Sequence, residues 1–274
     1  LLVKPHRLQY RARARDFPRS TTQFLSPNMY RGDRATEMTP IARGSALIKE
    51  ATTEVRLGFV RKVYGILSCQ LLLTVLIAAP ICQRGPAFVH KNGWMLILST
   101  VVMLATMVAM CCCRAQLRSF PLNYVFLLLI TLAMSVVVGF SSAMYTWQSV
   151  LLAAGLTVAI FMMMTIYAWT TTSDFTGMGP YLMGAFFVLI AFGFAISIMS
   201  LCGVAVHWAH IAYDILAVVL FTFYIVYDTQ LILGEFGGHK NGFSIDDYAF
   251  AAMNLYLDLV NLFLHILSLL GRRR

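Results

Sequence analysis

The stretch YAFAAMNLYLDLVNLFLHIL, residues 248–267, is apolar enough to lie in a lipid bilayer, yet four polar side chains interrupt it. Asn254, Asp258, Asn261 and His265 fall within about 60° of one another on a helix that turns about 100° per residue. Because an ionised group that faces hydrocarbon costs about 3 kcal/mol or more, this stripe must face protein or water. Asn254, Asn261 and His265 either line a pore or pair helices through hydrogen bonds. We therefore expect this segment to be the central helix of a bundle.

The composition of the whole chain places it among membrane proteins. Of the 274 residues, 59% are hydrophobic and 12% are charged, whereas an ordinary soluble domain has about 25% charged residues. Apolar runs of about 18 or more residues predict transmembrane helices. Such runs lie at about 64–83, 93–113, 120–144, 149–169, 180–206, 211–233 and 248–270. We predict an all-α polytopic membrane bundle of six to seven transmembrane helices, with the last segment central.

The N-terminal part of the chain differs in composition from the rest. Its first 24 residues carry six Lys and Arg side chains against a single acid and show no apolar periodicity. We predict that residues 1–55 are a basic, disordered segment and that residues 56–274 form the membrane domain. Residues 1–28 are either untranslated, with Met29 as the start, or an inert tail, or a targeting segment, because an Arg-rich, acid-poor start is typical of mitochondrial transit peptides.

Lysine and arginine flank the predicted spans unevenly, and this bias predicts the orientation. Those on the side of the N-terminal flank are Arg56, Arg61, Lys62, Arg114, Arg118 and Lys240, and those on the opposite side are Arg84 and Lys91. The N-terminal flank is therefore expected in the cytoplasm. The terminal Arg272, Arg273 and Arg274 do not fit seven full crossings. The last segment is thus either a full span with an exception at its end or a re-entrant segment.

A second carboxylate lies in the sixth apolar run, within VYDTQLIL at residues 226–233. Two carboxylates on neighbouring buried helices cannot both ionise without cost, so Asp228 and Asp258 are expected to share a proton. When protonated, such a pair is a hydrogen-bonded contact between helices. When deprotonated, it repels itself and leaves hard oxygen ligands that suit Ca²⁺. The two aspartates are therefore candidates for a pH-sensing gate that contacts Ca²⁺ transiently.

The segment HWAHIAYD, residues 207–214, places His207, His210 and Asp214 at i, i+3 and i+7, on one face of a helix. Three interpretations stay open from the residues alone. The side chains are solvated in the lumenal headgroup region, or form a cation-collecting vestibule at the non-cytoplasmic mouth, or bind zinc as in a seven-span hydrolase. The zinc site is disfavoured because no further histidine pair or positioned serine lies in another span.

The stretch VYDTQLILGEFGGHKNGFSIDDYAFAAMNLYLDLVNLFLHILSLLG, residues 226–271, resembles the C-terminal signature of the Bax-inhibitor or Lifeguard family. Further similar pieces are RKVYGILSCQLLLT at 61–74, RSFPLNYVFLLLITLAMS at 118–135 and TTTSDFTGMGPYL at 170–182. The likeness covers roughly residues 54–271. It implies an all-helical protein of endoplasmic reticulum or Golgi membranes, linked to a pH-sensitive Ca²⁺ leak and to suppression of cell death.

The resemblance also implies roles by position. The family's paired aspartates would be Asp228 and Asp258, and Arg118 or Arg114 would match a basic residue that is proposed to latch the closed pore. No cofactor is implied, and Ca²⁺ would be the permeant ion. The implied partners are Ca²⁺, protons, the lipid bilayer and membrane proteins that regulate cell death, with no nucleic acid. The mitochondrial inner membrane is the alternative location.

Other functions of paired aspartates were weighed against the leak. Intramembrane aspartyl proteases carry their second aspartate in a Gly-x-Gly-Asp setting, whereas Leu255, Tyr256 and Leu257 precede Asp258. The sequence also lacks a glycine-rich phosphate loop and a nucleophile elbow, so we do not expect an enzyme. A proton-coupled cation exchanger stays open because the same pair would serve a carrier. A non-conducting scaffold that regulates apoptosis is the third hypothesis.

Overall fold

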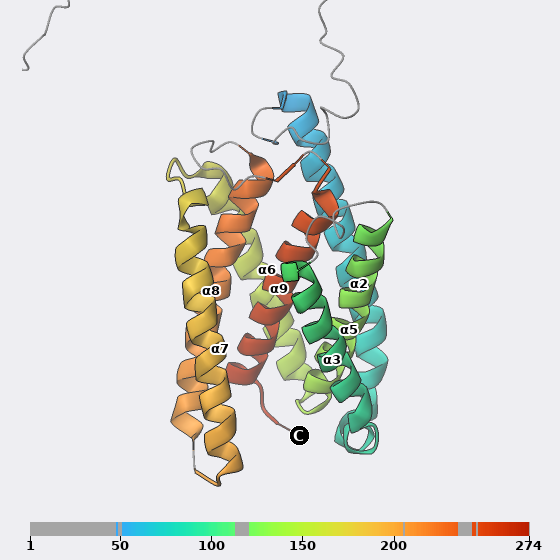
Figure 1. The fold of residues 1–274 in the computed structure, drawn as a ribbon. Coiled ribbons are helices and arrows are strands. Elements are labelled where there is room, and N and C mark those ends of the chain that lie inside the picture. The colour runs from blue at the N-terminus through green and yellow to red at the C-terminus, as the bar shows by residue number, and fades with distance from the viewer. Residues whose placement is uncertain are drawn as a thin grey trace, which may run out of the picture. The chain divides into compact units, whose positions relative to one another are not determined.

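The computed structural model describes residue 48 and residues 51–112, 121–204, 206–234, 243–244 and 246–273. Within these ranges the named elements are seven α-helices and one short 3₁₀ helix, and an isolated β-bridge joins Tyr145 and Arg273 (Figure 1). The elements are α2 (Thr53–Lys91), α3 (Gly93–Cys112), α5 (Leu122–Ala143), α6 (Trp147–Thr170), η2 (Thr176–Met178), α7 (Gly179–Leu201), α8 (His207–Leu233) and α9 (Tyr248–Leu270).

Most of these helices are of transmembrane length. Six of the described helices are long and apolar enough to cross a membrane, and α3 adds a shorter apolar stretch over Gly93–Thr106. The predicted all-α bundle of six to seven transmembrane helices is therefore confirmed. The predicted disordered segment 1–55 lies almost entirely outside the described residues.

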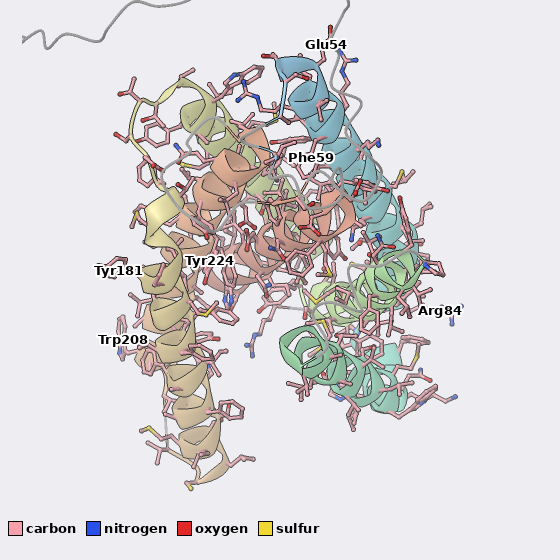
Figure 2. The ribbon with its side chains drawn as sticks, turned by 45° about the horizontal axis from the view of Figure 1, so that its top comes forward. Glu54, Phe59, Arg84, Tyr181, Trp208 and Tyr224 are labelled. Atoms are coloured by element: carbon pink, nitrogen blue, oxygen red, sulfur yellow. The ribbon has the colours of Figure 1, made fainter. Side chains whose placement is uncertain are left out.

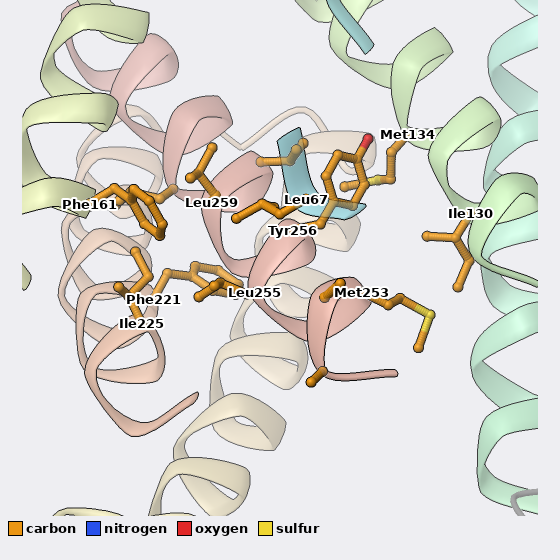
Figure 3. Close-up of a cluster of buried hydrophobic side chains, with 14 of the residues drawn as sticks. Leu67, Ile130, Met134, Phe161, Phe221, Ile225, Met253, Leu255, Tyr256 and Leu259 are labelled. Atoms are coloured by element: carbon orange, nitrogen blue, oxygen red, sulfur yellow. The ribbon is translucent and has the colours of Figure 1, made fainter. Parts of the chain in front are cut away.

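Helix α9 lies at the centre of the bundle. It packs against α2, α5, α6 and α8, and its side chains Leu255, Tyr256 and Leu262 are 0% exposed. Figure 3 shows Leu255 on the side of Phe221 from α8, and Tyr256 on the side of Met134 from α5. Close packing on all sides stabilises a helix in lipid, where the hydrophobic effect between helices is weak. The predicted central position of the last segment is thereby confirmed.

Consecutive helices run in alternating directions, which gives the bundle two ends (Figure 1). At the upper end α2 and α9 begin and α8 ends; at the lower end α8 begins and α9 ends. The α5–α6 turn also lies at the lower end, where the Thr146 amide donates to the Arg272 carbonyl over 3.0 Å. Because α9 is one uninterrupted helix, the last segment runs from the upper to the lower end and does not turn back as a re-entrant segment would.

Helices α2 and α5 approach each other closely at a glycine. A Cβ atom added to Gly139 would lie 3.0 Å from Ile81 Cβ and 3.1 Å from Ala78 Cα. Small residues at a helix crossing allow this approach and the packing that follows from it. The absent side chain at Gly139 therefore sets the spacing between α2 and α5.

Buried hydrogen bonds fix α2 against two of its neighbours. Gln70 Nε2 donates to Thr131 Oγ1 of α5 over 2.9 Å, and the hydroxyls of Thr74 and Tyr256 of α9 are 2.8 Å apart. All four side chains are buried. Polar pairs of this kind contribute about 1 kcal/mol each between membrane helices. They hold α2, α5 and α9 in one register.

Candidate functional site

The structure brings Asp228 and Asp258 together between α8 and α9. Asp228 lies in the last two turns of α8 and Asp258 lies near the middle of α9. The two residues are 4% and 7% exposed, and their carboxyls are within reach of a side-chain hydrogen bond. Two ionised carboxylates have no donor between them, so this contact requires a proton on one of the two. Asp258 Oδ2 is buried with no hydrogen-bond partner among the described residues.

An aromatic hydroxyl group borders this aspartate pair. Tyr224 lies one turn before Asp228 on α8 and is close enough to interact electrostatically with both carboxylates. Figure 2 shows Tyr224 towards the interior of the bundle, whereas Tyr181 and Trp208 project outward. The pair is thus enclosed by protein on the α8 side.

The residues around Asp228 in the YDTQ motif hold the upper half of α8 in place. Tyr227 packs so closely on Gly179 that a Cβ atom there would lie 2.6 Å from the Tyr227 hydroxyl. Gln230 Oε1 accepts from the Phe175 amide over 2.8 Å, and Gln230 Nε2 donates to the Ser173 carbonyl over 2.9 Å. These contacts fasten α8 to the α6–α7 connection and to the start of α7. The orientation of Asp228 therefore depends on its neighbours in the motif.

Leucine in place of Gln230 should destabilise the protein, because the Phe175 amide and the Ser173 carbonyl would both lose their partner. We expect a loss of about 1–3 kcal/mol, seen as a lower midpoint of thermal unfolding in detergent. The matched control is Gln148→Leu, since Gln148 is exposed in the first turn of α6. Equal midpoints for the two variants would show that the Gln230 clamp contributes nothing to stability.

The predicted polar stripe of α9 divides among three kinds of contact. Asp258 and His265 face α8, where His265 Nδ1 lies 2.8 Å from Asp214 Oδ1. Asn261 Nδ2 donates to the Leu257 carbonyl of its own helix over 2.8 Å, so this amide does not pair helices. Asn254 is half-buried on the same helix. Asp258 and His265, the ionisable members of the stripe, therefore face protein, as their cost in lipid requires.

The structure does not gather His207, His210 and Asp214 into one site. Among the described residues no group of three His, Cys, Asp or Glu is arranged to hold a metal ion. His207 and His210 are exposed, whereas Asp214 is 7% exposed and bonds to His265 and Ser268 of α9. The solvated interpretation is wrong for Asp214, because α9 supplies a donor to each of its carboxylate oxygens. Spacing within α8 could not reveal those donors.

The predicted latch residues Arg114 and Arg118 lie outside the described residues. A different basic side chain reaches the upper end of α8. Arg56, in the first turn of α2, donates through Nη1 to the Gly234 carbonyl over 3.3 Å. A cation at this position complements the free carbonyls at a helix C-terminus. The sequence singled out Arg56 only as a flanking charge, so this contact was missed.

The chain is similar in sequence to a known protein family and to individual known proteins. The family model described as "Inhibitor of apoptosis-promoting Bax1" matches residues 56–274. The chain is 36% identical to protein lifeguard 3 of Homo sapiens over 222 residues, which are 80% of this chain and 70% of that protein. Protein lifeguard 3 of Mus musculus is 35% identical, over 80% of this chain and 71% of its own length. Protein LIFEGUARD 3 of Arabidopsis thaliana is 35% identical, over 79% of this chain and 85% of its own length.

Proposed function

The chain belongs to the Bax-inhibitor or Lifeguard family of membrane proteins, and from this premise we propose that it is a pH-sensitive Ca²⁺ leak channel gated by Asp228 and Asp258. One observation carries the proposal, namely that two carboxyls meet inside the bundle while Asp258 Oδ2 has no partner among the described residues. A buried unpaired oxygen costs about 1–3 kcal/mol. An arrangement that stabilises only the fold would not retain that cost.

The proposed gate follows from the charge on the pair. At low pH the carboxyls share a proton and hold α8 against α9. As the pH rises the shared proton leaves, both carboxyls become charged, and the two like charges repel each other. Separation exposes oxygen ligands of the kind that Ca²⁺ prefers. Rising pH therefore opens the path and falling pH closes it.

The proposed cellular role is Ca²⁺ homeostasis in the endoplasmic reticulum or Golgi. A leak in such a membrane lowers the lumenal Ca²⁺ load. Suppression of cell death would follow indirectly from that lower load, in keeping with the description of the matching family model. Neither the organelle nor a protein partner is needed for the gating mechanism itself.

The test is Ca²⁺ entry into dye-loaded proteoliposomes between about pH 5 and 8, the physiological range of proton sensing. We expect flux that rises with pH, and no such flux from vesicles carrying the double variant Asp228→Leu with Asp258→Leu. A wild-type protein that passes no Ca²⁺ at any pH would leave the scaffold hypothesis in its place. Flux that runs only against a counterflow of protons, in fixed proportion, would identify an exchanger.

A further inference from the structure

A second buried polar contact joins α8 and α9, at the lower end of the bundle. Asp214 Oδ1 accepts from His265 Nδ1 over 2.8 Å, and Asp214 Oδ2 accepts from the Ser268 hydroxyl over 2.5 Å. We name these three residues the Asp214 cluster. Asp214 and Asp228 are fourteen residues apart on α8, which corresponds to about 21 Å along a helix. The cluster is therefore spatially separate from the aspartate pair.

The Asp214 cluster contains the residue types of a hydrolase triad but not its connections. In a triad the serine hydroxyl donates to the histidine, which then acts as the base. Here the Ser268 hydroxyl donates to the Asp214 carboxylate instead. Ser268 is thus not activated as a nucleophile. What remains is a charge contact between a carboxylate and an imidazole.

The imidazole is held in a fixed orientation. Its ring stacks on Phe221 at 5.9 Å between centroids and an interplanar angle of 15°, and it meets Tyr213 edge-on at 5.4 Å. Both aromatic rings belong to α8. His265 therefore cannot turn away from Asp214 without disturbing the packing between α8 and α9.

The cluster forms part of the wall of a cavity of about 410 Å³ at the lower end. The polar residues of the lining are Ser141, Tyr145, Asp214, His265, Ser268 and Arg273. They come from α5, the α5–α6 turn, α8, α9 and the segment that follows α9. Four parts of the chain therefore meet α9 around this cavity.

The segment after α9 is fastened across this end. The Arg272 amide donates to Ser149 Oγ over 3.0 Å, the Arg272 carbonyl accepts from the Thr146 amide over 3.0 Å, and Arg273 forms a bridge with Tyr145. The titratable or charged side chains described around His265 are Asp214, Tyr213, Tyr145 and Arg273. Asp214 is the one anion among them.

We infer that the Asp214 cluster is a second proton-responsive contact between α8 and α9, which acts in series with the aspartate pair and senses the pH at the lower end. The inference rests on the proposed leak. When His265 carries a proton, it forms an ion pair with Asp214. When it is neutral, only a hydrogen bond to the carboxylate remains, which is the weaker contact. Acidification at the lower end therefore tightens the join between the two helices.

Flux measured with the pH changed on one side at a time tests this inference. In vesicles of determined orientation, acidifying the lower side should reduce wild-type Ca²⁺ flux about fivefold, the difference expected between a charge-assisted and a neutral hydrogen bond. His265→Gln and Asp214→Asn should each abolish that response and keep the response to the upper side. Asp228→Asn should abolish the response to pH at the upper side and keep the response to pH at the lower side. A lower-side response unchanged in both His265→Gln and Asp214→Asn would overturn the inference.

A second measurement keeps the inference testable if the protein conducts nothing. Ser141, which lines the cavity from α5, is replaced by cysteine and labelled with a membrane-impermeant thiol reagent. The labelling rate relative to that of a control cysteine should be higher at high than at low pH, and His265→Gln should remove this excess. The control is Lys91→Cys, an exposed position at the lower end of α2, because thiol reactivity itself rises with pH.

The two measurements separate the two ideas. If labelling of Ser141→Cys follows pH through His265 while no Ca²⁺ passes, the proposed leak fails and the contact stands. If flux instead follows the pH while the labelling rate matches the control both with His265 present and in His265→Gln, the proposed leak stands, and the inferred pH response of the Asp214 cluster is wrong.

Discussion

Asparagine in place of either Asp228 or Asp258 is expected to remove most of the pH dependence of Ca²⁺ flux and to leave only the smaller response of the Asp214 cluster. Two like charges about 4 Å apart at an effective dielectric constant of about 20 repel each other by about 4 kcal/mol. Because every 1.4 kcal/mol changes an equilibrium about tenfold, full ionisation of the pair would shift the balance of open and closed states by up to about a thousandfold. Asparagine cannot ionise, so either variant loses this repulsion. The measurement is flux into proteoliposomes at the two ends of the pH range.

The matched control for this prediction is Asp246→Asn. Asp246 is an exposed carboxylate just before α9, so the chemical change is the same but no buried partner is affected. We expect the Ca²⁺ flux of the Asp246→Asn variant to depend on pH as the flux of the wild type does. If Asp228→Asn and Asp258→Asn also do so, the pair is not the pH sensor. A variant that loses its pH response but stays open would still identify the pair as the sensor.

Replacing both aspartates by leucine should cost no stability and should instead raise the unfolding midpoint. Buried ionisable pairs exchanged for apolar residues of similar volume are often neutral or stabilising by about 1–4 kcal/mol. The double leucine variant also removes the unpartnered Asp258 Oδ2. Asp228→Leu alone should behave differently, because Asp258 would then be buried without its partner, at a cost of about 1–3 kcal/mol.

The wild type, the single variants Asp228→Leu and Asp258→Leu, and the double variant form a double-mutant cycle. Thermal unfolding in detergent measures the coupling between the two sites. A double variant less stable than both single variants would mean that the pair is kept for the fold. In that case the unpartnered Asp258 Oδ2 would give a functional gate no energetic support.

The sequence was most informative where a prediction depends only on the pattern of residues along one helix. The central position of α9 could be predicted because Asn254, Asp258, Asn261 and His265 share one face, and a polar face excludes contact with lipid. The contact between Asp214 and His265 could not be predicted in this way. The two residues are separated by 51 positions, and spacing within a helix says nothing about how two helices cross. Each was therefore assigned to a different site.

The same limit applies to the YDTQ motif. Asp228 was conspicuous because a carboxylate in an apolar run is costly. Gln230 was not, since an amide near a helix end is ordinary in sequence. Its importance arises from Ser173 and Phe175, which reach it only in the folded bundle. Loop backbone partners of this kind leave no periodic pattern to find.

Helix α7 packs chiefly on α8, and its outer face carries exposed apolar side chains. A membrane helix adapts to a thicker or thinner bilayer by tilting, at a modest energetic cost. Since α7 joins the bundle through the helix that carries both Asp214 and Asp228, its tilt bears directly on the contacts between α8 and α9. Membrane thickness, which differs between organelles and with sterol content, is therefore expected to act on the same helix pair that we propose as the proton-responsive gate.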